Sequence, residues 1–108
     1  ASTDSIPTSA MQEDHVSMGW AACMKLRRSL VNLSHVIGIE VMTAARAIEM
    51  RAPLKPSAAT ASVIAGLRET VPGAGPDRFM APEIEASAGA VSSGAVLGWA
   101  EAVTGPLR

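Results

Sequence analysis

From residue 16 to residue 50 the chain reads VSMGWAACMKLRRSLVNLSHVIGIEVMTAARAIEM, without a proline. Apolar residues recur through this stretch at the spacing of one helical face: Val16, Trp20, Leu26, Leu30, Leu33, Ile37, Val41, Ala44, Ala45 and Ile48. Beyond Leu30, more apolar residues fall between these and leave a narrow polar strip: Asn32, His35, Thr43, Arg46 and Glu49. The pattern predicts one very long helix that is buried on most of its sides.

The length of this helix argues against a free-standing compact unit. At about 1.5 Å per residue, about 35 helical residues extend on the order of 50 Å. A compact chain of about this size has a radius of gyration of only about 13 Å. Short helices elsewhere in the chain cannot cover both ends of such a rod. We therefore expect most of its burial to come from other chains or from further parts of the polypeptide, which makes the chain a piece of a helical assembly.

The residues before the long helix are expected to form a loop that leads into a site segment. Residues 1–10 are rich in Ser, Thr and Pro, which are loop-forming residues. Ser9 followed by Gln12 fits a capping box, and Asp14 offers a second cap. We therefore expect the helix to start between residues 10 and 15, and to end near Arg51, before the prolines at 53 and 56.

Two shorter helices are predicted after the long one. Ser57 can cap a helix that ends near Thr70, with Val63, Ile64 and Leu67 facing inward. Pro82 in a first turn indicates a third helix that stops near Gly94. The last fourteen residues are weakly patterned, and no alternating strand pattern occurs. Gly89 and Gly94, with Ala86, Ala88 and Ala90, are expected to permit close helix packing. The sequence thus predicts an all-α fold, with one very long central helix followed by shorter helices. The chain is expected to comprise a lead-in loop (1–10), the site segment with the long helix (11–51), a second helix (57–70) and a third helix (82–94).

Composition excludes several classes of function. Nine Lys and Arg against ten Asp and Glu give a formal charge of −1, with no basic block that would indicate nucleic-acid binding. No apolar run is long enough to span a membrane. Cys23 is the only cysteine and cannot form an internal disulfide, so a cytoplasmic setting is expected, with Cys23 as a small buried apolar residue. His15, Cys23 and His35 lack the spacing of a metal site, so no metal is expected.

The residues just before the helix carry the strongest indication of function. Gln12-Glu13-Asp14-His15-Val16-Ser17-Met18-Gly19 crowds two carboxylates, an amide, an imidazole and a hydroxyl into eight positions. Together with residues 5–11, this stretch closely resembles the carboxy-terminal signature of histidine ammonia-lyases. Later segments resemble the same family in the same order, and coverage runs from about Asp4 to Gly94: Ala21-Ala22 with Lys25-Leu26, Ile39-Glu40-Val41 through Ala47-Ile48-Glu49, and Asp77 through Glu85.

The resemblance implies an all-α homotetrameric enzyme whose long helices pack in a central bundle. By this resemblance the enzyme converts L-histidine to trans-urocanate and ammonia. Histidine ammonia-lyases use a methylidene-imidazolone (MIO) electrophile that is made from an Ala-Ser-Gly tripeptide of the same polypeptide. These 108 residues contain no Ala-Ser-Gly. The chain is therefore expected to be a carboxy-terminal fragment that is inactive alone and forms a homo-oligomer through the long helix.

The resemblance also assigns the candidate site residues. Glu13 corresponds to the acidic residue that faces the substrate imidazole, with a catalytic and substrate-binding role, and Gln12 to a neighbouring substrate-binding amide. A carboxylate suits this task because it can pair with, or exchange a proton with, a ring whose pKa lies near neutrality. The structural alternatives are that the charge of Glu13 only stabilises the first turn of the helix and that Gln12 only caps this helix. Asp14 and Ser17 are expected to cap the helix, and His15 to be packed or hydrogen-bonded.

Two other functions stay open at this point. The chain could act as a non-catalytic helical oligomerisation module, because the electrophile is absent. It could also be part of a phenylalanine or tyrosine ammonia-lyase or aminomutase, although those enzymes generally have Gln-Asp where this chain has Glu13-Asp14.

Overall fold

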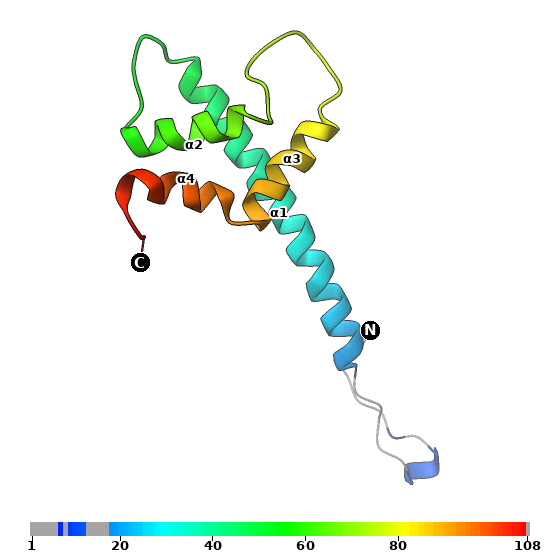
Figure 1. Ribbon diagram of the computed structural model, residues 1–108. Coiled ribbons are helices and arrows are strands. Elements are labelled where there is room, and N and C mark those ends of the chain that lie inside the picture. The colour runs from blue at the N-terminus through cyan, green and yellow to red at the C-terminus, as the bar shows by residue number, and fades with distance from the viewer. Residues whose placement is uncertain (1–6, 8, 13–17, 108) are drawn as a thin grey trace. The chain divides into compact units, whose positions relative to one another are not determined.

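A computed structural model describes residue 7, residues 9–12 and residues 18–107 of the chain. Within these residues the fold consists of four α-helices and one 3-10 helix, with no strand, so the all-α prediction with one long helix is confirmed (Figure 1). The elements are the 3-10 helix η1 (Ser9–Met11) and the helices α1 (Gly19–Glu49), α2 (Ala58–Arg68), α3 (Ala81–Ser92) and α4 (Ala95–Thr104).

Helix α1 begins later than the sequence predicted. Met18 lies in a turn and the helix starts at Gly19, after the predicted start between residues 10 and 15. Ser9 has a positive φ of 52°, whereas a residue that caps a helix normally has an extended backbone. The backbone N–H of Gln12 donates to the carbonyl oxygen of Ser9 at 3.1 Å, which closes only a short turn. The spacing of Ser9 and Gln12 therefore marks the turn η1 and not the start of the long helix. The second proposed cap, Asp14, lies outside the described residues.

The chain divides into two compact units, residues 1–32 and residues 33–108. In the first unit, the described part of α1 exposes most of its side chains, including Trp20 at 79%. Cys23 is also exposed, so the expectation that it is buried is wrong for this chain. Cys23 lies in the half of α1 that belongs to the first unit, where neighbouring side chains such as Leu26 are exposed as well.

The second unit has a small core built around the end of α2. Leu67 and Val71 are almost completely buried, together with Ala45 of α1. Ile64 and Trp99 pack against this cluster, as do Val41, Met42 and Ala86. Leu67 and Ile64 thus face inward as predicted for the second helix, and Ser57 caps α2 by accepting the backbone N–H of Thr60 at 3.3 Å.

Two glycines allow helices of the second unit to pack closely. A Cβ atom at Gly38 would lie 2.8 Å from the backbone nitrogen of Ala88, so α1 and α3 are in close contact there. A Cβ atom at Gly66 would lie 2.4 Å from the indole ring of Trp99. The sequence had predicted close packing at Gly89 and Gly94 with Ala86, Ala88 and Ala90. Ala88 does lie against Gly38 and Ala86 packs against the core, but a Cβ at Gly89 or Gly94 would meet nothing within 4 Å. Gly94 instead has a φ of 80° and redirects the chain from α3 into α4.

Helix α4 was not predicted, because almost every residue from Ala95 to Val103 is apolar or glycine and the segment shows little helical periodicity. It packs against α2, where the Ser62 hydroxyl donates to the carbonyl oxygen of Trp99 at 2.7 Å.

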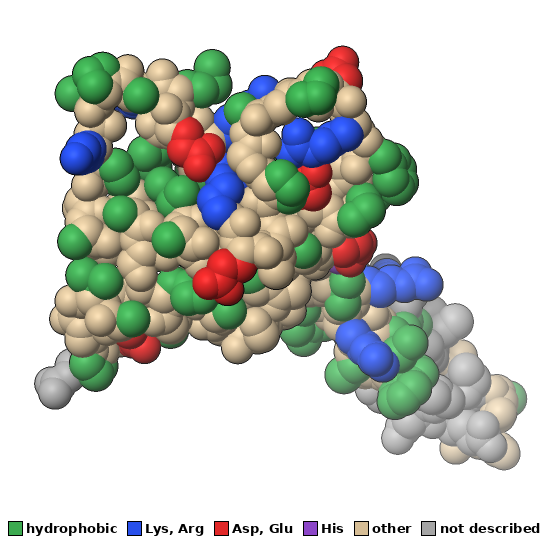
Figure 2. Space-filling view, turned by 45° about the horizontal axis from the view of Figure 1, so that its top comes forward, with side chains coloured by type: hydrophobic (Ala, Val, Ile, Leu, Met, Phe, Trp, Pro, Cys, Tyr) green, Lys and Arg blue, Asp and Glu red, His purple; other side chains and the backbone are tan. Residues whose placement is uncertain are grey.

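Large apolar side chains remain exposed along α1 in both units. Figure 2 shows hydrophobic side chains interspersed with charged ones on the surface in view. Only Gly38 and Ala45 of α1 are buried within the described residues. No helix of the described part is long and apolar enough to cross a membrane. The exposed large apolar residues of α1 are Trp20, Met24, Leu26, Leu30, Val31, Leu33, Val36 and Ile39.

Candidate functional site

The structure describes one of the two predicted site residues. Gln12 is exposed and lies in a turn directly after η1. Glu13, Asp14, His15 and Ser17 lie outside the described residues, so their predicted roles stay predictions.

The backbone that leads to Gln12 is unusual. Ser9, Ala10 and Met11 have φ values of 52°, 55° and 69°. Residues other than glycine rarely adopt this left-handed region, because the Cβ atom approaches the following carbonyl oxygen. Three such residues in a row define a tight left-handed turn, which ends in the backbone hydrogen bond from Gln12 to Ser9.

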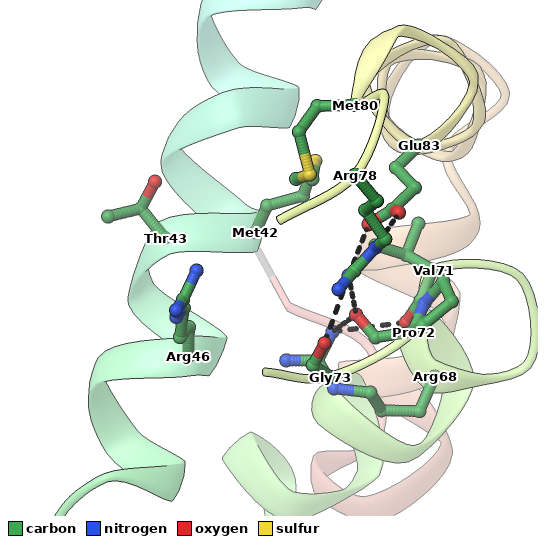
Figure 3. Close-up of a pocket in the computed structure, with 10 residues that line it drawn as sticks. All are labelled: Met42, Thr43, Arg46, Arg68, Val71, Pro72, Gly73, Arg78, Met80 and Glu83. Carbon is green, nitrogen blue, oxygen red and sulfur yellow. Dashed lines mark hydrogen bonds and ion pairs between the residues drawn. The ribbon is translucent and has the colours of Figure 1, made fainter. Parts of the chain in front are cut away.

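The second unit contains a cleft of about 180 Å³ that sequence analysis did not predict. Figure 3 shows α1 on one side of this cleft, with the loop after α2 and the start of α3 on the other. Three arginines and one carboxylate stand among mostly apolar neighbours. The lining residues are Met42, Thr43, Arg46, Arg68, Val71, Pro72, Gly73, Arg78, Met80 and Glu83.

An ion pair between Arg78 and Glu83 forms one wall of the cleft. The guanidinium donates through Nε to Oε1 of Glu83 and through Nη2 to Oε2, the latter at 2.9 Å. The same Nη2 donates to the carbonyl oxygen of Gly73 at 3.0 Å. These hydrogen bonds lower the pKa of Glu83 and raise that of Arg78, since each stabilises the charged form of its partner. Glu83 is therefore ionised at neutral pH, and its charge is matched by Arg78.

A second ion pair fixes the end of α2 to the end of α1. Arg68 donates through Nε and Nη2 to the two carboxylate oxygens of Glu49, both at 2.8 Å. Arg68 also donates through Nη1 to the carbonyl oxygen of Val71 at 3.1 Å. The hydrogen bonds from Arg68 lower the pKa of Glu49. Because this pair is partly exposed, its contribution to stability is modest, about 0.2–1 kcal/mol for a typical surface pair.

Helices α1 and α3 are joined by polar contacts of a different kind. The hydroxyl of the fully buried Ser87 donates to the carbonyl oxygen of Gly38 at 2.8 Å. His35 Nε2 lies 3.0 Å from Oε1 of Glu85. His35 thus has a carboxylate neighbour, and no group of three metal-ligating side chains occurs among the described residues.

The cleft was missed because its lining comes from separate stretches of sequence between residues 42 and 83, and only tertiary packing brings them together. The one signal available was that Arg78 and Glu83 both lie in the segment Asp77 to Glu85, one of the segments in which the sequence resembles histidine ammonia-lyases.

Comparison with known proteins identifies relatives of the whole chain. The family model described as aromatic amino acid lyase matches residues 1–69. Histidine ammonia-lyase of Streptomyces avermitilis is 53% identical over 99% of this chain, and that of Symbiobacterium thermophilum is 47% identical over the full chain. A crystal structure of histidine ammonia-lyase from Trypanosoma cruzi superposes with a TM-score of 0.84 at 34% identity, covering 94% of this chain.

These matches involve only part of each relative. The chain spans 21% of the two curated enzymes and 20% of the Trypanosoma cruzi protein. The match to the family model nevertheless includes more than half of this chain, from the predicted site segment through α1 and α2. The chain belongs to the aromatic amino acid lyase family.

Proposed function

We propose that this chain is the carboxy-terminal part of a histidine ammonia-lyase, an enzyme that converts L-histidine to trans-urocanate and ammonia. The observation that carries the proposal is the 53% identity to the Streptomyces avermitilis histidine ammonia-lyase along 99% of the chain. The segment Gln12-Glu13-Asp14-His15 supplies the chemical argument for histidine as the substrate. A cytoplasmic setting, expected from the single cysteine, belongs to the same proposal.

Glu13 is the proposed catalytic residue. Its carboxylate would bind the imidazole of the substrate and hold or exchange a proton with it, because imidazole titrates near neutral pH. Gln12 would stand beside it and hydrogen-bond the substrate through its amide, which can both donate and accept. The exposed turn after η1 leaves the Gln12 side chain accessible to a ligand.

The electrophile of the family is not made by this chain. That group forms from an Ala-Ser-Gly tripeptide, and none occurs in the 108 residues. When present, the electrophile activates the amino group of the substrate for departure. The residues here do not fit its formation, so this chain alone is expected to bind part of the substrate and not to deaminate it.

The exposed apolar surface of α1 supports an oligomeric enzyme. We propose that α1 associates with α1 of further copies, and that this homo-oligomer covers side chains such as Leu33 and Val36, which the chain by itself leaves exposed.

A chimeric enzyme tests the proposed function. The corresponding residues of the Streptomyces avermitilis histidine ammonia-lyase would be replaced by this chain, and urocanate formation followed by its absorbance. We expect the chimera to deaminate L-histidine in preference to L-phenylalanine. In the chimera, Glu13→Gln should lower kcat/KM for histidine by about 100-fold or more, the range for a general acid or base.

A matched control separates this role from general damage. Glu69→Gln makes the same chemical change at an exposed position after α2 and should leave kcat/KM within about two-fold of the chimera. Unchanged histidine turnover in the Glu13→Gln chimera would refute the role of Glu13. Urocanate production by the isolated 108-residue chain would refute its expected inactivity.

A further inference from the structure

The cleft of the second unit contains one arginine, Arg46, that has no anionic partner among the described residues. Arg68 is engaged by Glu49 and Arg78 by Glu83, each through two hydrogen bonds. Arg46 lines the same cleft from α1 and, within the part of the chain that the structure describes, its side chain makes no hydrogen bond or ion pair. Three guanidinium groups thus stand against two carboxylates, which leaves one positive charge at Arg46.

The two paired arginines shape the cleft. Arg68 binds the carbonyl oxygen of Val71, and Arg78 binds that of Gly73, so both hold the loop after α2 in place. Figure 3 shows these interactions opposite the side of the cleft formed by α1, which carries Arg46. The wall that faces Arg46 is therefore fixed by hydrogen bonds, and an incoming ligand does not need to order it.

The lining favours one class of anion. A guanidinium presents two parallel N–H groups that match the two oxygens of a carboxylate. Met42, Val71 and Met80 offer apolar contacts beside it, and would suit the carbon body of the same ligand. A phosphate has more oxygens that need hydrogen-bond donors, but the other two arginines are already paired with carboxylates. The phosphate oxygens without a donor would face apolar groups, at a cost in free energy.

The size of the cleft limits the ligand further. Its volume of about 180 Å³ is below the roughly 300–1,000 Å³ of sites for drug-sized ligands. A nucleotide or a long acyl chain would not fit inside.

We propose that this cleft is a binding site for a small monocarboxylate with an apolar body, with Arg46 as the residue that pairs with the carboxylate. The proposal concerns the second unit alone and does not depend on the proposed lyase function or on Glu13.

Equilibrium dialysis of the 108-residue chain with radiolabelled butyrate tests the proposal, with sodium chloride and sodium phosphate as competitors at matched ionic strength. We expect saturable binding of butyrate that chloride and phosphate displace only weakly. Arg46→Gln should raise the Kd at least about ten-fold, because the paired cation is lost. Arg46→Lys should give an intermediate Kd, since lysine keeps the positive charge but cannot form the bidentate pair of hydrogen bonds to a carboxylate.

Controls and a second measurement keep the test decisive. Arg51→Gln removes an exposed arginine that does not line this cleft and should leave the Kd unchanged. In the wild-type chain, nuclear Overhauser effects should connect butyrate protons to the methyl groups of Met42 and Met80, whether or not any variant folds. An unchanged Kd in a folded Arg46→Gln chain, tighter binding of phosphate than of butyrate, or the absence of those Overhauser effects at saturation would each overturn the proposal.

Discussion

Gly38 is a residue at which a single added methyl group would disturb the backbone packing of the second unit. Its Cβ would lie 2.8 Å from the backbone nitrogen and 3.1 Å from the Cα of Ala88, and neither atom can rotate away. Alanine in place of glycine improves helix propensity by about 1 kcal/mol. Overpacking costs about 1–3 kcal/mol, and α3 would have to separate from α1. We therefore expect Gly38→Ala to lower the free energy of unfolding, measured by urea denaturation and circular dichroism.

A second glycine provides the matched control for this substitution. Gly89 is also helical, but a Cβ there would meet nothing within 4 Å. Gly89→Ala should therefore raise the free energy of unfolding by up to about 1 kcal/mol through propensity alone. If both substitutions stabilise the chain equally, the close contact between α1 and α3 is absent in solution.

The same two glycines show what sequence reasoning could not supply at this scale. Glycines occur at 38, 66, 89 and 94, and nothing in the sequence separates those that lie against another helix from those that do not. The distinction depends on which helix faces each position, which only the tertiary structure determines. Similarly, Gln12 and Glu13 were selected through a family resemblance, because their residue types alone fit capping as well as substrate binding.

Helices were predictable where local signals were strong. Ser57 marks the start of α2 through a side-chain cap, and Pro82 marks the first turn of α3. Helix α4 carries no such signal: its N-cap is a left-handed glycine without a side-chain hydrogen bond. Its place in the fold comes from its contact with α2, which a local pattern does not reveal.

The link between α1 and α2 is expected to weaken in acid. Hydrogen bonds from Arg68 lower the pKa of Glu49 below the usual 4.5. A carboxyl group whose pKa is lowered on folding stabilises the fold above its unfolded-state pKa, and this contribution is lost as the pH falls through its folded-state pKa. Glu83 acts in the same direction. We therefore expect the urea midpoint of the second unit to be constant near neutral pH and to fall below about pH 4.5.

Comparison with a charge-removing variant isolates the part due to Glu49. Glu49→Gln should be less stable than wild type at pH 7, and the difference should shrink at an acid pH below the lowered pKa of Glu49, because the wild-type carboxyl is protonated there. Glu69→Gln, at a glutamate whose side chain has no ion pair among the described residues, should track wild type at both pH values. A Glu49→Gln difference of the same size at both pH values would contradict this account of the ion pair.

On the scale of the whole molecule, the exposed apolar side chains of α1 are expected to drive self-association. Val36 is 60% exposed and Ile39 45% exposed, and a run of such residues along one helix marks an interaction surface. Sedimentation velocity of the isolated chain should show oligomers, and Val36→Glu with Ile39→Glu should shift them to monomers, because carboxylates are costly to bury. Thr70→Glu with Ala74→Glu adds the same charge at exposed positions outside α1 and should leave the oligomers intact. A wild-type chain that sediments as a monomer at all concentrations would rule out this surface as sufficient for assembly.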